Sequence, residues 1–285
     1  MTASEQAFVD AHVHFWDPGV FDYPWLATVP ALDRPFLPSD LPQDLDRQGI
    51  VFVQADCLPE QSVAEASWVD GLREAGAPVV GAVAHAPLEA GTGAAMVLRR
   101  LALQPLVVGV RRLLQDEAVG FAVLPGFVAG VGLLAGPGIV MDLCIRRHQL
   151  AEVTELVRRC PQVEFVLDHL GKPEISPGSL RPWTADLNRL SALPNVRCKL
   201  SGLATEADPD HRTPADLMPF LRNAIDAFGP RRCMFGSDWP VLTTAMPYGR
   251  WLDLVREAVA DLTADEQDLV LRRTASIAYG QDKAA

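Results

Sequence analysis

Short apolar runs alternate with longer amphipathic segments along most of the chain. Eight runs rich in Val, Ile, Leu and Phe predict strands at 7–15, 49–56, 78–86, 106–113, 138–145, 163–169, 195–201 and 232–238. Most of these runs are apolar at nearly every position, which is typical of strands covered on both faces. Segments with helical periodicity lie between or after them, for example at 61–75, 147–159, 214–228 and 263–279. The last of these begins with Thr263 and Glu266 in the spacing of a capping box.

This alternation favours a closed (β/α)8 barrel, the TIM-barrel fold, over an open doubly wound sheet. The glycine fingerprint of a dinucleotide-binding fold is absent. The glycine-rich stretch 126–138 does not match it and is predicted to form a loop and a short helix before the fifth strand. A chain of 285 residues is long enough for one such barrel, so residues 1–285 are predicted to form a single domain.

The connection after the first strand, residues 17–48, is too long for a simple turn and holds six prolines. Long loops in compact domains are usually functional lids or disordered. Its aromatic residues, Phe21, Tyr23, Trp25 and Phe36, argue against disorder. We predict a lid that folds over the C-terminal mouth of the barrel, with Trp25 forming an apolar wall.

Composition narrows the classes of partner. The net charge of -11 and the pI near 5.0 argue against a nucleic-acid partner, which requires clustered Lys and Arg. No apolar stretch approaches the roughly 20 residues that span a bilayer. The N-terminal sequence lacks the features of a secretion signal, and the five cysteines are scattered. These observations predict a cytoplasmic protein with reduced thiols that acts on a small molecule. They do not decide whether the protein forms a homodimer.

The segment "VDAHVHFWDP" (9–18) places two histidines two residues apart in the first predicted strand. Residues two apart share one face of a strand, so His12 and His14 project side by side. Further polar side chains lie in or at the ends of later strands: Gln54, Arg111, Arg112, Asp142, Asp168, His169, Lys199, Ser201, Ser237 and Asp238. The strand ends of a barrel meet at one mouth, which would gather such groups.

These residue types can perform hydrolysis. A metal or an imidazole cluster polarises a carbonyl oxygen, and a carboxylate takes a proton from water and returns it to the leaving oxygen. Asp238 is the candidate base. The alternatives are that Asp238 only caps the turn that begins at Asp-Trp-Pro, and that His12 and His14 form a satisfied pair in a core strand.

Five segments in order, "DAHVHFW", "VGVRRLLQDE", "FVLDHLGKP", "CKLSGL" and "FGSDWPV", cover nearly the whole chain. Together they resemble the amidohydrolase superfamily, and within its amidohydrolase 2 type the group of sugar lactonases and 2-pyrone-4,6-dicarboxylate lactonases. The resemblance implies that His12, His14, His169 and Asp238 form the catalytic site, and that the reaction cleaves a lactone C–O bond.

The sequence departs from the binuclear members of this superfamily. No lysine stands at the end of the fourth strand to bridge two metals, because Arg111 and Arg112 occupy that position, and the fifth strand offers Asp142 instead of a histidine. We therefore expect one divalent ion, zinc, bound by His12, His14, His169 and Asp238. Some members of the group work without a metal, so a metal-independent reaction stays open.

Substrate contacts are expected from Arg111, Gln54, Trp25, Asp142 and His148. Neighbours on a strand point oppositely, so only one of Arg111 and Arg112 should enter the mouth, and we favour Arg111. By the same rule Asp168 should face the helices. For His148 a surface role at a helix N-terminus is an equal alternative.

The sequence thus predicts a hydrolase that opens a small lactone, such as an aldonolactone, to its hydroxy acid. One alternative is a metal-dependent decarboxylase of an unsaturated or aromatic acid on the same barrel. Another is a barrel that binds a sugar acid without turning it over. Neither the particular lactone nor its ring size follows from the residues.

Overall fold

The strands form one parallel sheet in sequence order. A computed structural model describes residues 6–136 and 138–280. The strands are β1 (Phe8–Val13), β2 (Arg47–Val53), β3 (Val79–His85), β4 (Val107–Arg111), β5 (Val140–Leu143), β6 (Phe165–Leu167), β7 (Val196–Leu200) and β8 (Cys233–Phe235). A parallel bridge between Val13 and Trp239 brings the β1 and β8 sides together. The predicted (β/α)8 barrel is confirmed, and each predicted run overlaps one strand, although β2 begins at Arg47, before its predicted run.

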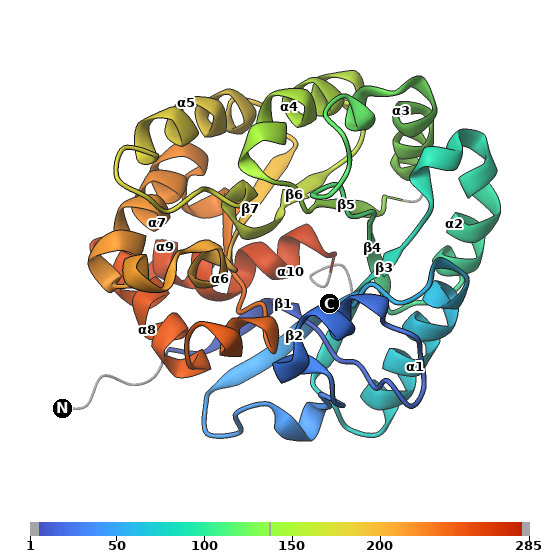
Figure 1. Cartoon of the computed structure of the whole chain (residues 1–285), viewed down its shortest axis with the longest axis horizontal. Coiled ribbons are helices and arrows are strands. Elements are labelled where there is room, and N and C mark those ends of the chain that lie inside the picture. Colours follow the sequence, from blue (N-terminus) through green and yellow to red (C-terminus); the bar gives the residue numbers. More distant parts are fainter. Residues whose placement is uncertain (1–5, 137, 281–285) are drawn as a thin grey trace.

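The longer helices surround the strands on the outside, whereas α10 (Thr274–Ala278) lies at the centre of the view against the strands (Figure 1). The helices before α10 are α1 (Ser62–Glu74), α2 (Ala95–Ala102), α3 (Pro125–Gly132), α4 (Leu150–Arg159), α5 (Leu180–Ser191), α6 (Leu203–Glu206), α7 (Pro214–Phe228), α8 (Tyr248–Ala258) and α9 (Ala264–Asp268). The longer ones bury one face. In α4 the buried side chains include Leu150, Val153, Leu156 and Val157, which is the spacing of an amphipathic helix. None of the helices in the described ranges has the length and apolar character that a bilayer crossing requires.

The last predicted helix, 263–279, is helical from Ala264 to Ala278 but changes type partway. Its capping box is present, because Thr263 Oγ1 accepts from the Glu266 amide while Glu266 accepts from the Thr263 amide. A wider π-helical turn, Leu269–Arg273, then separates α9 from α10. Leu269, Val270 and Leu271 are all buried in this turn, whose residues contact β1 and β8. The α-helical hydrogen-bonding pattern changes to a π-helical one at the residues that pack against the barrel.

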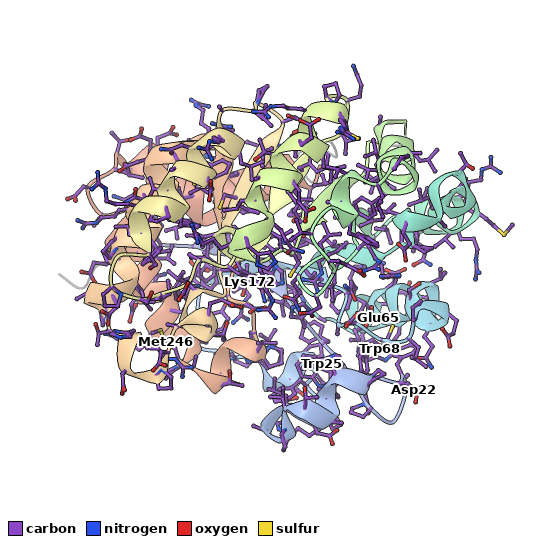
Figure 2. The ribbon with its side chains drawn as sticks, turned by 45° about the horizontal axis from the view of Figure 1, so that its top comes forward. Asp22, Trp25, Glu65, Trp68, Lys172 and Met246 are labelled. Atoms are coloured by element: carbon purple, nitrogen blue, oxygen red, sulfur yellow. The ribbon has the colours of Figure 1, made fainter. Side chains whose placement is uncertain are left out.

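The long connection after β1 is ordered and built from short 3-10 turns at 24–28, 30–32 and 38–40, each of which begins with proline. The Trp25 indole donates to the Ala55 carbonyl at 2.8 Å, and the Tyr23 hydroxyl donates to Glu65 on α1 at 3.3 Å. Figure 2 shows Trp25 and Glu65 where this connection meets α1. Burial raises the pKa of Glu65 to about 7. These contacts fix the connection against the loop after β2.

Helix α3 approaches the segment after β3 so closely that one position in it must be glycine. A Cβ at Gly130 would lie 1.9 Å from the Leu88 carbonyl oxygen, whereas a Cβ at Gly132 in the same helix would meet nothing within 4 Å. We expect Gly130→Ala to lower the free energy of unfolding by about 1–3 kcal/mol or more, because the helix must move away from a rigid carbonyl. Urea denaturation measures this.

Gly132→Ala is the matched control and should leave stability unchanged or raise it by about 1 kcal/mol, through helix propensity alone. Equal effects of the two substitutions would contradict the close approach of α3 to Leu88.

Candidate active site

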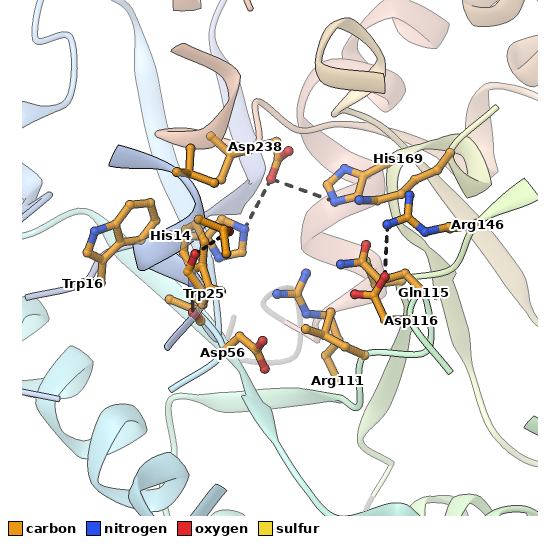
Figure 3. Close-up of a pocket in the computed structure, with 17 residues that line it drawn as sticks. His14, Trp16, Trp25, Asp56, Arg111, Gln115, Asp116, Arg146, His169 and Asp238 are labelled. Carbon is orange, nitrogen blue, oxygen red and sulfur yellow. Dashed lines mark hydrogen bonds and ion pairs between the residues drawn. The ribbon is translucent and has the colours of Figure 1, made fainter. Parts of the chain in front are cut away.

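A cavity of about 440 Å³ opens at the carboxyl ends of the strands (Figure 3). We call it the barrel-mouth cavity. Its lining combines aromatic and aliphatic walls with charged groups, and consists of His14, Trp16, Trp25, Thr28, Val29, Ala55, Asp56, Arg111, Leu113, Gln115, Asp116, Cys144, Arg146, His169, Lys172, Asp238 and Val241. Trp25 lies in this lining, where the sequence placed it.

Three imidazoles, two from β1 and its end and one from the turn after β6, converge on one carboxylate. His14 Nε2 lies 3.3 Å from Asp238 Oδ1, and the Nε2 atoms of His12 and His169 lie 3.6 and 3.9 Å from the same oxygen. His12 Nε2 and His14 Nε2 are 3.1 Å apart. His12 is completely buried beneath the cavity, while the other three side chains reach its surface. We call these four residues the imidazole–carboxylate cluster.

Barrel closure and unusual backbone geometry present these side chains. The Asp238 amide donates to the His12 carbonyl at 2.9 Å, and the His14 amide donates to the Trp239 carbonyl at 2.8 Å, so the end of β8 is tied to β1. His169 and Asp238 both have left-handed backbone, with φ of 53° and 65°. Gly202 leaves room for the His169 ring, since a Cβ there would lie 2.4 Å from Nδ1.

Hydrogen bonds behind the rings set the protonation of at least one imidazole. His14 Nδ1 lies 2.7 Å from the Val53 carbonyl oxygen. A carbonyl only accepts, so Nδ1 carries the proton and Nε2 presents its lone pair. His169 Nδ1 is likewise held by Ser201 Oγ at 2.9 Å. Such partners behind the ring are typical of metal-binding histidines.

The cluster therefore fits a bound cation. The His14 Nε2 lone pair and the Asp238 carboxylate are both acceptors, yet they lie 3.3 Å apart. Two acceptors at this distance are stabilised by a cation between them. Tetrahedral zinc ligands, with metal–ligand distances near 2.0–2.1 Å, are themselves separated by about 3.3 Å. Two overlapping groups could hold an ion, namely His12, His14 and Asp238, and His12, Asp168 and His169.

The electrostatics keep His12 and His169 neutral and the Asp238 carboxylate charged. Burial lowers the pKa of His169 to about 4, and burial together with Lys199 holds the pKa of His12 well below its usual value. Burial by itself would raise the pKa of Asp238, but the neighbouring histidines, His169 first, outweigh it and hold that pKa below its usual range. Neutral imidazoles and an ionised carboxylate are the forms that bind a metal.

A second layer of charge lies below the cluster. Lys199 Nζ lies 2.5 Å from Asp142 Oδ2 and 3.0 Å from Asp168 Oδ1, and Arg111 lies 3.3 Å from Asp168 Oδ2. We call Arg111, Asp142, Asp168 and Lys199 the buried ionic network. Asp168 Oδ1 also lies 3.2 Å from His12 Nδ1, which joins the network to the cluster.

The inward position of Asp168 corrects the expectation that it faces the helices. The strand alternation behind that expectation ends at Leu167, where β6 stops and a tight turn begins. Lys199 was not assigned a role from the sequence. A lysine inside the otherwise apolar run "CKL" was the available signal, since a buried ammonium requires carboxylate partners.

The structure places Arg111, rather than Arg112, in the cavity lining. One Arg111 nitrogen donates to the Gln54 carbonyl at 2.7 Å. Arg112 instead forms ion pairs with Glu89 and Glu117 at 3.1 and 2.5 Å.

Three expected substrate contacts lie outside the cavity lining. Asp142 is completely buried against Lys199 and accepts from Tyr279 at 2.9 Å, so it holds the network together. Gln54 is also completely buried, and its side-chain oxygen accepts from the Asp56 amide. His148 is exposed before α4, in a neighbouring pocket of about 290 Å³ that shares Arg146 and Lys172 with the barrel-mouth cavity, and it does not line the cavity itself.

Several polar groups of the cavity were not predicted: Asp56, Gln115, Asp116, Arg146 and Lys172. All lie on loops after strands, where no periodicity indicates direction. Their only signal was position, because loops at the carboxyl ends of barrel strands build active sites.

A barrel with histidines and an aspartate gathered at its C-terminal mouth defines the class of TIM-barrel hydrolases that can use a metal. The model of the amidohydrolase family matches residues 9–281. The chain belongs to this family.

Three proteins illustrate the likeness. An L-fucono-1,5-lactonase from Burkholderia multivorans is 34% identical over 287 residues, 95% of each chain. A crystal structure of an amidohydrolase from Burkholderia multivorans with bound zinc is 34% identical, covers 96% of this chain and 99% of its own, and superposes with a TM-score of 0.85. A probable 2-pyrone-4,6-dicarboxylic acid hydrolase from Acinetobacter baumannii shares the fold at 17% identity, with 96% and 100% coverage and a TM-score of 0.76.

Lys199 should be essential for stability. Replacing it with methionine leaves Asp142 and Asp168 buried without their shared cation, so we expect Lys199→Met to lower the free energy of unfolding by about 3–5 kcal/mol. The exposed pair of Arg189 with Asp186, at 2.7 Å, provides the control. Arg189→Met should change stability by at most about 1 kcal/mol. Similar losses in urea denaturation would show that the network does not depend on Lys199.

Proposed function

We propose that the chain is a lactonase that opens a sugar lactone to its hydroxy acid, with Asp238 as the general base and acid. The observation that carries this proposal is the convergence of His12, His14 and His169 on Asp238 at one cavity. Similarity over nearly the full chain to an L-fucono-1,5-lactonase supports the substrate class.

Asp238 accepts a proton from water during attack on the lactone carbonyl and returns it to the ring oxygen as the C–O bond breaks. Its low pKa makes Asp238 a weak base, so the attacking water has to be acidified. A divalent ion, zinc for this set of nitrogen and oxygen donors, would lower the pKa of that water and polarise the carbonyl when bound. Arg111 orients the substrate from the opposite side of the cavity.

The charge balance favours a single ion held by His12, His14, His169 and Asp238. The buried ionic network and Asp238 together contain two cations, Arg111 and Lys199, and three carboxylates. One negative charge therefore remains before any ion binds. The two candidate ligand groups also share His12, so they overlap rather than forming separate sites.

Asp238→Asn tests the base. Asparagine keeps the shape of the side chain and tolerates the left-handed backbone of this position. We expect kcat/KM on a panel of sugar lactones to fall by about 10²–10⁴-fold, because the amide cannot take a proton. A pH-indicator assay follows the acid released, and circular dichroism checks the fold. Undiminished turnover by a correctly folded variant would remove Asp238 from the mechanism. Release of carbon dioxide, instead of acid, from an unsaturated acid would favour the decarboxylase.

Elemental analysis tests whether the protein binds a zinc ion at the imidazole–carboxylate cluster. We expect about one zinc per chain in the purified protein and a large loss of bound zinc in His14→Asn, because one ligand is missing. His148→Asn, which changes an exposed histidine outside the cavity, should keep its zinc. Full activity in a preparation stripped of metal by a chelator would overturn the proposed zinc site. It would not contradict the proposed lactonase activity.

A further inference from the structure

The cations that face the barrel-mouth cavity are already neutralised. Each has a carboxylate partner within 3.5 Å. The ion pairs are Arg111–Asp168 at 3.3 Å, Arg146–Asp116 at 3.0 Å and Lys172–Glu206 at 2.9 Å. A carboxylate on a substrate would have to compete with these partners, so the cavity offers it little net attraction.

Asp56 is different. Its carboxylate forms no hydrogen bond or ion pair with any residue in the ranges 6–136 and 138–280. Figure 3 shows this side chain projecting into the same cavity as Arg111, below His14. An unpaired carboxylate at this place adds a negative field to that of Asp238 and leaves its oxygen lone pairs free to accept hydrogen bonds from a ligand.

The backbone at Asp56 is held in an unfavourable conformation. Its φ is 60°, in the left-handed region that favours glycine. The amide of Asp56 donates to the buried Gln54 side chain at 2.6 Å, which fixes this geometry. Strained residues that the surrounding structure fixes in place cluster at ligand-binding sites. Glycine would adopt this backbone without penalty, so replacing Asp56 with glycine removes the carboxylate without straining the chain.

We propose that Asp56 binds hydroxyl groups of the substrate, and that the substrate is an uncharged, polyhydroxylated lactone rather than one bearing a carboxylate. This inference rests on the proposed lactonase function. A carboxylate accepts two hydrogen bonds from neighbouring hydroxyls, and bonds to a charged acceptor are the stronger kind. The half-buried indole of Trp25 supplies apolar surface for the C–H face of the ring. The same carboxylate repels an anionic substituent.

The test compares three lactones with wild-type protein and Asp56→Asn: L-fucono-1,5-lactone, the unsubstituted δ-valerolactone, and 2-pyrone-4,6-dicarboxylate. We expect the variant to raise KM for the first by about 10–100-fold, because hydrogen bonds to a charged group are lost. Its kcat/KM for the unsubstituted lactone should stay within about twofold, since no hydroxyl contacts are made. For the dicarboxylate, KM should fall.

Asp56→Gly separates binding from folding. It should lose hydroxyl binding as Asp56→Asn does, yet keep or raise the melting temperature, because the left-handed backbone suits glycine. Asp33→Asn removes an exposed carboxylate outside the cavity lining and should leave all three lactones unchanged.

The outcomes are distinct. Equal changes on hydroxylated and unsubstituted lactones, or no change, would overturn the role of Asp56 while leaving the lactonase intact. A wild-type protein that hydrolyses no lactone would overturn the proposed function itself. A dicarboxylate preferred by the wild type over the hydroxylated lactone would overturn the inferred substrate class.

Discussion

The buried ammonium group of Lys199 neutralises carboxylates that would otherwise lie uncompensated inside the barrel. It lies within 3.0 Å of both Asp142 and Asp168 in the buried interior of the barrel, where an unpaired carboxylate would be strongly destabilising. With Asp168 held in place, its carboxylate lies against the rear nitrogen of His12. The position of the deepest imidazole in the cluster thus depends on charges that never contact a substrate.

A second constraint is the backbone at the ends of the strands. Within residues 6–136 and 138–280, five non-glycine residues have left-handed φ, and four of them, Asp56, His169, Lys172 and Asp238, line the barrel-mouth cavity. A regular strand would send alternate side chains outward to the helices. The left-handed turn breaks that alternation and presents side chains to the mouth, at a cost in backbone strain that the surrounding packing compensates.

The pairing of charges gives two carboxylates of the cavity different roles. Asp238 belongs to the reacting cluster, and Asp56 is proposed to recognise the substrate. The negative charge of Asp238 is shared with three imidazoles, whereas each cation of the lining is paired with an acid of its own. The chain carries an overall charge of -11, yet its active-site field depends on which individual carboxylates remain unpaired. Selectivity among lactones follows from that local balance.

The sequence by itself determined the alternation of strands and helices, the barrel, and the pairing of His12 with His14, because these follow from the period of side chains in regular elements. The strand pattern also placed His169 and Asp238 at the mouth, and the motif resemblance grouped them with the two histidines in one site. Only the tertiary structure decided that Asp168 points inward, that Asp142 supports Lys199, and that Asp56 and Arg146 reach the cavity. Periodicity ends where a strand ends, and beyond that point a side chain's direction is set by contacts with residues distant in sequence, such as Gly202 beside His169.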